Sequence, residues 1–175
     1  MKRLGLLRHA KSEWDDLGVR DFDRGLNARG HKGAALMGRH ILSHGPAWDL
    51  VLASPAERVK RTIGASGIEA PIAWEPGAYL ADAATLLGLV QHLPERAGDV
   101  LIVGHNPGLQ ELLLALVSPG LEDPLFDEAA EKFPTAAYAV LELPIERWAD
   151  CTPGRGRLVH FARPRDLDPD LGPEA

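Results

Sequence analysis

The feature that most constrains the fold is a repeated pattern, in which a short apolar run is followed by a helical stretch. Such runs cover residues 3–9 (RLGLLRH), 48–55 (WDLVLASP) and 99–108 (DVLIVGHNPG). Helical patterns follow over 26–45, 56–66 and 109–118, and a further one covers 82–93. Strands that alternate with helices are typical of a parallel sheet covered by helices on both faces. The sequence therefore predicts a three-layer α/β/α sandwich with a mostly parallel sheet.

The last third of the chain predicts an antiparallel addition to this sheet. Residues 136–143 (AAYAVLEL) and 157–163 (RLVHFAR) flank a loop that contains Pro and Gly, as expected for a hairpin at a sheet edge. With 175 residues the chain suits one folded unit, which we place at residues 1–163. Residues 164–175 are rich in Pro and Asp, and we expect them to form a mobile tail.

Two helix starts can be predicted from capping residues. Asn27 is a candidate N-cap for the helix over 26–45, in which Leu36, Ile41 and Leu42 are expected to share one side. In the second unit, Ser54 is the candidate N-cap and Pro55 would occupy the first helical position.

Composition excludes several classes of function. The chain has 19 Lys and Arg against 25 Asp and Glu, a net charge of −6, which argues against general binding of nucleic acid. Only four apolar residues precede Arg8, too few for a signal peptide, and no apolar run approaches the length of a membrane span. The single cysteine, Cys151, cannot form an internal disulfide and fits a reducing compartment. We therefore expect a cytoplasmic protein with no membrane partner, and the sequence leaves its oligomeric state open.

Polar residues end three of the expected strands: Arg8-His9, Ser54-Pro55 and Gly104-His105. In open α/β sheets, ligands bind beyond the carboxyl ends of the strands, where helix N-termini favour anions. Arg58 lies one turn into the helix that follows Ser54. Two histidines and two arginines are thus expected to meet at one edge of the sheet, where a phosphate group would bind.

This combination of side chains suits phosphoryl transfer. Arginine forks bind phosphoryl oxygens in pairs and neutralise the charge that spreads over them during transfer. A neutral imidazole is a competent nucleophile toward phosphorus, so His9 can carry the group as a covalent intermediate. His105 can donate to the same oxygens, and Arg24, in the loop after the first strand, can fold back over the pocket.

Five motifs in order resemble those of the histidine phosphatase superfamily, which has the phosphoglycerate-mutase-like fold. They are LLRHAKS (6–12), DRGLNARG (23–30), LASPAERVKRT (52–62), VGHNPG (103–108) and KFPTAAYAVLEL (132–143). The residues of these motifs and the short length of the chain are most similar to the SixA-type phosphohistidine phosphatase branch. The resemblance spans roughly residues 3–163. It implies that His9 is the nucleophile, that Arg8, Arg24 and Arg58 bind phosphate, and that His105 is the second histidine of the pocket, so that His9, Arg8, Arg58 and His105 form the catalytic set.

The chain departs from the superfamily pattern at two places. Ala10 stands where the first motif usually has Gly. Larger members also carry a glutamate general acid after the third motif, and here Tyr79 falls near that place, with Glu75 and Asp82 on either side as candidate acids.

The leading hypothesis is a phosphatase that needs no metal or other cofactor and acts on phosphohistidine in a protein. The alternatives are a phosphomonoesterase or mutase for a small phosphorylated metabolite, and a catalytically idle phosphate-binding module. His40 and His44 are four residues apart, but no third ligand is evident, so we interpret them as a solvated helix face. Asp15 and Asp16 are expected beside the pocket mouth together with Trp14, where their charge would disfavour a second phosphate on the substrate.

Overall fold

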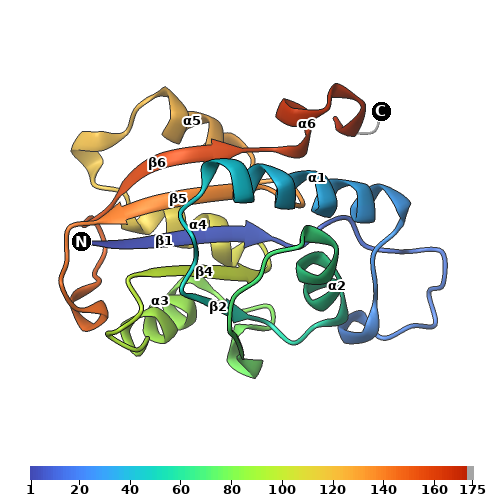
Figure 1. The fold of residues 1–175 in the computed structure, drawn as a ribbon, viewed down its shortest axis with the longest axis horizontal. Coiled ribbons are helices and arrows are strands. Elements are labelled where there is room, and N and C mark those ends of the chain that lie inside the picture. Colours follow the sequence, from blue (N-terminus) through green and yellow to red (C-terminus); the bar gives the residue numbers. More distant parts are fainter. Residues whose placement is uncertain (173–175) are drawn as a thin grey trace.

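The structure, a computed structural model, describes residues 1–172 and contains one six-stranded sheet (Figure 1). The strand order is β3-β2-β4-β1-β5-β6. The strands are β1 (Lys2–Arg8), β2 (Leu50–Ala53), β3 (Ile72–Trp74), β4 (Asp99–Gly104), β5 (Tyr138–Leu143) and β6 (Arg157–Ala162). The first four run parallel, whereas β5 is antiparallel to β1 and β6 is antiparallel to β5. The predicted α/β sandwich with a mostly parallel sheet and an edge hairpin is confirmed.

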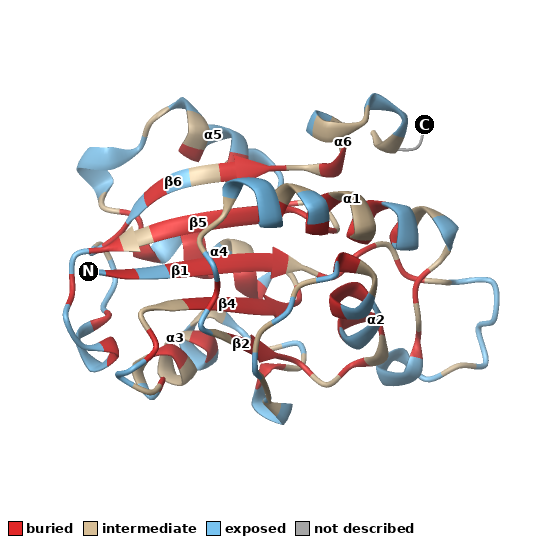
Figure 2. Ribbon diagram, viewed as in Figure 1, coloured by how far each residue is buried: buried red, intermediate tan, exposed pale blue. Residues whose placement is uncertain are grey.

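Helices cover both faces of the sheet. They are α1 (Ala28–His44), α2 (Glu57–Ser66), α3 (Ala83–Gln91), α4 (Gly108–Leu116), α5 (Pro124–Glu131) and α6 (Pro164–Leu167). One core packs the sheet against α3, α4 and α5, and the other packs it against α1 and α2. Strand β1 serves both cores, because Leu4 and Leu6 belong to the first and Leu7 to the second. Figure 2 shows that the central strands β1, β4 and β5 are largely buried.

Helix α1 packs through a face of small residues. A Cβ on Gly38 would lie 1.8 Å from the carbonyl oxygen of Ser66 at the end of α2, so only glycine allows the two helices to approach this closely. Ile41 is buried as expected, but Leu42 is 64% exposed, so the predicted apolar side of this helix is wrong at that position. The spacing of large apolar residues in the sequence does not reveal that glycines form this contact surface.

Of the two predicted helix caps, one is confirmed. The side chain of Asn27 accepts a hydrogen bond from the backbone N–H of Gly30 and caps α1. The prediction that Ser54 caps α2 is wrong, because the helix begins only at Glu57 after Ala56 as N-cap. The Ser54 hydroxyl instead lies 2.8 Å from Nε2 of His105.

The C-terminal segment, which the sequence leads us to expect as a mobile tail, is folded from Pro164 to Gly172. It forms α6 and a short 3-10 helix (Pro169–Leu171). Arg29 of α1 donates hydrogen bonds to the carbonyl oxygens of Asp170 and Gly172, which joins this segment to the rest of the domain. Residues 173–175 of the expected tail lie outside the described residues.

Candidate active site

The ends of β1, β2 and β4 meet at one edge of the sheet, because the register of the parallel strands is nearly level. Arg8 pairs with Gly104, and Ala53 pairs with Val103. The residues that follow these strand ends, His9, Ser54 and His105, are all buried. His9 and His105 have ring centroids 5.3 Å apart. The predicted convergence of the two histidines is confirmed.

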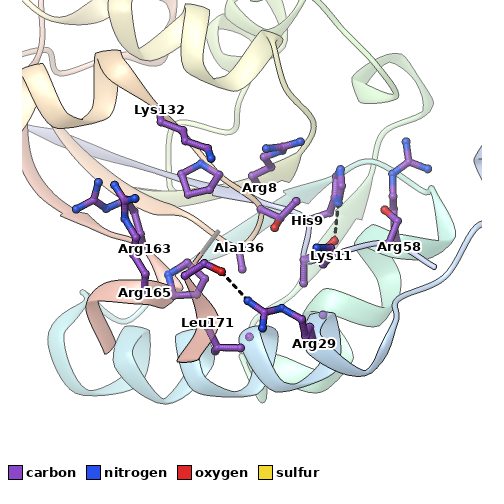
Figure 3. A pocket seen from close by; sticks show the side chains of 18 of the residues that line it. Arg8, His9, Lys11, Arg29, Arg58, Lys132, Ala136, Arg163, Arg165 and Leu171 are labelled. Atoms are coloured by element: carbon purple, nitrogen blue, oxygen red, sulfur yellow. Dashed lines mark hydrogen bonds between the residues drawn. The ribbon is translucent and has the colours of Figure 1, made fainter. Parts of the chain in front are cut away.

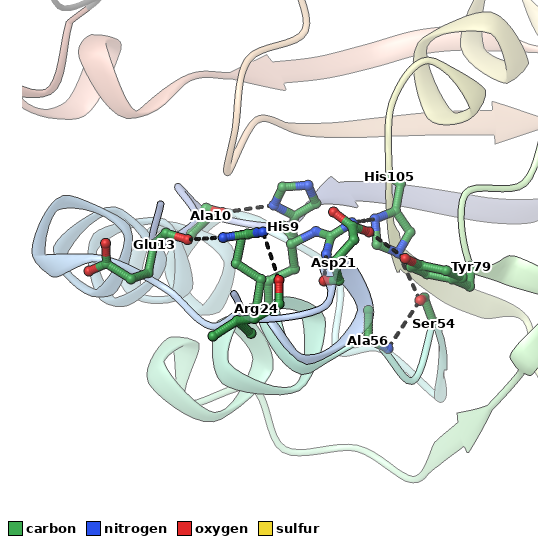
Figure 4. Close-up of polar contacts among 11 residues, drawn as sticks. His9, Ala10, Glu13, Asp21, Arg24, Ser54, Ala56, Tyr79 and His105 are labelled. Carbon is green, nitrogen blue, oxygen red and sulfur yellow. Dashed lines mark hydrogen bonds and ion pairs between the residues drawn. The ribbon is translucent and has the colours of Figure 1, made fainter. Parts of the chain in front are cut away.

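His9 is held in a defined orientation by the main chain. Its Nδ1 lies 2.7 Å from the carbonyl oxygen of Ala10 (Figure 4). A carbonyl oxygen only accepts, so Nδ1 carries the proton and Nε2 keeps its lone pair. Burial lowers the pKa of His9 to about 3, and the charges of Arg8 and Arg58 act in the same direction. The ring is therefore neutral at pH 7.

His105 is positioned by two polar side chains. Its Nδ1 lies 3.3 Å from Nη2 of Arg58, and its Nε2 lies 2.8 Å from Oγ of Ser54. Since a guanidinium only donates, Nδ1 is the acceptor and the proton of His105 resides on Nε2, which donates to Ser54. Burial lowers the pKa of His105 to about 4, and the neighbouring Arg58 adds to this effect.

Arg58 is bound by a carboxylate that the sequence analysis missed. The residue lies in the first turn of α2 and is buried. Its Nη1 donates to the carbonyl oxygen of Asp21 at 2.7 Å, and its Nη2 donates to Oδ2 of Asp21 at 3.0 Å. The Tyr79 hydroxyl donates to the same Oδ2, and the Tyr79 ring stands edge-on to His105. This bond from Tyr79, followed by Arg58, lowers the pKa of the Asp21 carboxyl, so Asp21 is ionised at neutral pH.

Arg8 points its guanidinium into the cavity beside His9 (Figure 3). Nη1 donates to the carbonyl oxygen of Phe133 at 3.2 Å, and the buried Nε has no hydrogen-bond partner among the described residues. Burial, and then the like charge of Arg58, lowers the pKa of the Arg8 guanidinium. Two cations that repel each other across a partly buried site favour an anion between them.

Arg24 is buried, but it does not line this cavity. Its guanidinium donates to the carbonyl oxygens of Glu13, Asp16 and Val19, and it lies 4.0 Å from the centre of the Trp14 ring. Figure 4 shows this side chain directed into the loop after β1. In this structure Arg24 therefore holds the loop 13–19 together, and the predicted direct contact of Arg24 with phosphate remains a prediction.

The two candidate acids, Glu75 and Asp82, do not line the cavity either. Glu75 accepts a hydrogen bond from the backbone of Gly77, and Asp82 accepts one from Thr85, so both carboxylates cap helices. Asp21 is instead the one carboxylate among the described residues that line the cavity. Asp21 belongs to a short 3-10 helix (Asp21–Asp23) that does not directly follow a strand in the sequence, so no sequence pattern pointed to it.

The two aspartates expected beside the pocket mouth are not part of the cavity lining. Trp14 lines the cavity, but Asp15 and Asp16 do not, and both are exposed. Basic residues line the cavity instead, from the loop after β1, from α1, from the end of α5 and from residues 163–165: Lys11, Arg29, Lys132, Arg163 and Arg165.

Three of the other histidines, His40, His44 and His160, form a separate cluster. Nε2 of His40 lies 2.8 Å from Nε2 of His160, and His44 stacks on His40. Within residues 1–172, no group of three or more His, Cys, Asp or Glu side chains is arranged to hold a metal ion.

Comparisons with known proteins show the family to which the chain belongs. The family model of the histidine phosphatase superfamily (branch 1) matches residues 4–85. An uncharacterized protein of Mycobacterium tuberculosis is 37% identical over 160 residues, which cover 91% of this chain and all of that protein. An uncharacterized chloroplastic protein of Arabidopsis thaliana is 32% identical over 123 residues, 63% of this chain and 56% of that protein.

Solved structures extend the likeness over the whole fold. A structure described as a phosphohistidine phosphatase SixA of Nakamurella multipartitia has a TM-score of 0.84 and 30% identity, covering 93% of this chain and 96% of that one. A second SixA structure, from Agrobacterium tumefaciens, has a TM-score of 0.75 and 32% identity, covering 92% and 97%. A SixA structure complexed with tungstate is 23% identical with a TM-score of 0.73 and shares the fold. This chain is therefore a member of the histidine phosphatase superfamily, a phosphatase of the SixA-like branch.

Proposed function

We propose that this phosphatase removes the phosphoryl group from phosphohistidine in a protein, through a covalent phosphohistidine intermediate on His9. The observation that carries the proposal is the orientation of His9. Its Nδ1 is committed to the Ala10 carbonyl, which leaves Nε2 unprotonated in a cavity lined by Arg8 and Arg58. A neutral imidazole in this state has the lone pair that a nucleophile needs.

In the proposed reaction, Nε2 of His9 attacks phosphorus, and the bond between phosphorus and the substrate imidazole breaks. The electron pair of that bond stays on the substrate imidazole, which leaves as a neutral ring because its other nitrogen already holds a proton. Water then attacks phosphorus, the P–Nε2 bond breaks, and its electron pair returns to His9. Phosphate leaves with both protons of the water and loses one to solvent.

The remaining residues act on the charge of the phosphoryl group. Arg8 and Arg58 would bind its oxygens and stabilise the charge that develops on them during transfer. His105 would donate to the same oxygens once its ring nitrogen turns from Ser54 to the anion. Arg24, which holds the loop 13–19 beside the pocket in this structure, would also bind the phosphoryl group.

The substrate class follows from the missing acid. An alkyl phosphate releases a strongly basic alkoxide and needs a proton donor, which typically contributes about a hundred- to ten-thousandfold. Glu75 and Asp82 cap helices and do not line the cavity, whereas Asp21 lines it but has a lowered pKa, so none of the three is in place to donate a proton to the leaving group. A leaving imidazole has no such need. The SixA structures described as phosphohistidine phosphatases support the same substrate class.

The test compares kcat/KM for a phosphohistidine-bearing protein with a series of aryl and alkyl phosphates, all in EDTA. We expect turnover of phosphohistidine and aryl phosphates and a steep fall as the leaving group becomes more basic, unchanged in Glu75→Gln and Asp82→Asn. A shallow dependence that becomes steep in either variant would identify a carboxylate acid and favour a phosphomonoesterase or mutase of small metabolites. No turnover in EDTA would favour an idle phosphate-binding module or a metal-dependent reaction.

We also propose a cytoplasmic location, supported by the single cysteine, which is buried and forms no disulfide among the described residues. None of the helices in residues 1–172 is long and apolar enough to cross a membrane. Fractionation of cells that express the tagged chain tests this location.

A further inference from the structure

The cavity that holds the candidate nucleophile is larger and more basic than a phosphoryl group requires. Its volume is about 540 Å³, within the usual range for sites that enclose a drug-sized ligand. Seven of the twenty residues that line it are Lys or Arg, and one is acidic. The whole chain has 19 basic and 25 acidic residues, so the cavity opposes the overall charge of the molecule. Such a local concentration of cations attracts a polyanionic ligand.

The basic residues form two groups within the cavity. Arg8 and Arg58 lie beside His9, whereas Lys132, Arg163 and Arg165 lie beyond Arg8, on the side away from Arg58 (Figure 3). We call Lys132, Arg163 and Arg165 the basic wall. Its residues come from the end of α5 and the start of α6, two segments that are more than thirty residues apart in sequence.

The wall is held in place by contacts outside the phosphoryl site. Arg163 forms a two-pronged ion pair with Asp166, at 3.0 Å for both nitrogens. Asp166 also accepts from the backbone N–H of Arg163 and so fixes the start of α6. Lys32 of α1 pairs with Asp168 at 3.2 Å. The first pair thus fixes the start of α6, and the second attaches the segment that carries Arg165 to α1.

The other two cations of the wall are available to a ligand. Within the described part of the chain, neither Lys132 nor Arg165 forms a salt bridge. Lys132 is exposed and Arg165 is half-buried, so each can meet an anion without leaving the cavity edge. Neither residue is needed for the proposed attack of His9, which involves the other side of the cavity.

We propose that the basic wall is a second anion subsite, which binds acidic side chains flanking the phosphohistidine of the protein substrate. The inference rests on the proposed function, because it describes the segment around the same phosphohistidine. Residues one or two positions from the modified histidine in an extended segment lie about 3–7 Å along the chain from it, and both groups of cations line the same cavity. Lys132 and Arg165 would select acidic segments over neutral ones.

The test uses two phosphohistidine peptides that differ only in their flanks, one with Asp and Glu and the other with Asn and Gln. We expect the wild type to prefer the acidic peptide by about tenfold in kcat/KM, carried mainly by KM, as two partly solvated ion pairs would give. The preference should shrink with added salt. In Lys132→Glu/Arg165→Glu it should disappear or reverse, whereas Arg39→Glu/Lys60→Glu, which changes the net charge equally outside the cavity, should keep it.

Phenyl phosphate separates failure of this inference from failure of the proposed function. For each variant, kcat/KM for each peptide is divided by kcat/KM for phenyl phosphate, so that a general loss of activity cancels. Equal rates for the two peptides in the wild type, or a preference that survives in Lys132→Glu/Arg165→Glu, would overturn the subsite. If a second phosphate on an aryl phosphate raised kcat/KM more than the acidic flanks raise it for the peptide, the assignment of the subsite to a peptide would be overturned. Turnover of phenyl phosphate with no turnover of either peptide would refute the proposed function itself.

Discussion

The two buried histidines should make folding stability depend on pH in a way that can be worked out from the structure. The pKa of His9 lies at about 3 in the folded chain, against about 6.5 for an exposed histidine. Between these values the unfolded chain binds the proton and the folded chain does not, so the free energy of unfolding falls as the pH falls. From pH 7 to pH 5 the loss from His9 is about 2 kcal/mol. His105, with a pKa of about 4, should add a loss of similar size, also about 2 kcal/mol.

The assay is urea denaturation at pH 7 and pH 5 in chloride, without phosphate or sulfate, for wild type and His9→Asn. The asparagine keeps a donor for the Ala10 carbonyl but does not titrate. Other titrating groups contribute equally to both proteins, so the difference isolates His9. We expect His9→Asn to lose about 2 kcal/mol less than wild type between the two pH values. An equal loss in the two proteins would refute the buried, neutral state of His9.

Two further predictions use matched substitutions. Arg58→Ala should lower kcat/KM by about a hundred- to a thousandfold, because it removes a charge-assisted contact in the transition state. Arg61→Ala, on the exposed side of the same helix, should change kcat/KM little. Comparable losses for the two variants in steady-state assays would mean that Arg58 is not a phosphate ligand. Gly38→Ala should lower the free energy of unfolding by about 1–3 kcal/mol or more, because its Cβ would meet the Ser66 carbonyl, whereas Gly64→Ala should stabilise α2 by about 0.5–1 kcal/mol. Chemical denaturation checks both values, and a neutral Gly38→Ala would contradict the close helix contact.

The central part of the site could be predicted because it depends on strand ends. His9, Arg58 and His105 follow strands whose parallel register brings their ends together, so their order in the sequence is enough to place them. The acidic and basic lining could not be predicted in this way. Asp21 lies in a loop, and Lys132 and Arg163 reach the cavity only because distant segments pack on the same edge.

The candidate acids show a second limit. A carboxylate that caps a helix and one that serves in catalysis look alike in a sequence, and only the backbone around Glu75 and Asp82 identifies them as caps. The apolar pattern also fails at Leu42, which is exposed because the buried face of α1 is formed by other, mostly small residues: Gly30, Gly33, Ala34, Met37, Gly38 and Ile41. Local patterns therefore predict the elements and the strand-end residues, whereas long-range packing decides which other side chains reach the site.

The measurement that tests the central claim most directly is the capture of the phosphoryl group on the enzyme. Wild type is mixed briefly with labelled substrate on the millisecond to second scale, quenched in alkali and digested, and the labelled peptide is identified. We predict a label that is stable to alkali, labile to acid and located on His9, and that is missing in His9→Ala although that variant remains folded. A label on another residue, or turnover in His9→Ala above about a tenth of the wild-type rate, would contradict the covalent route through His9.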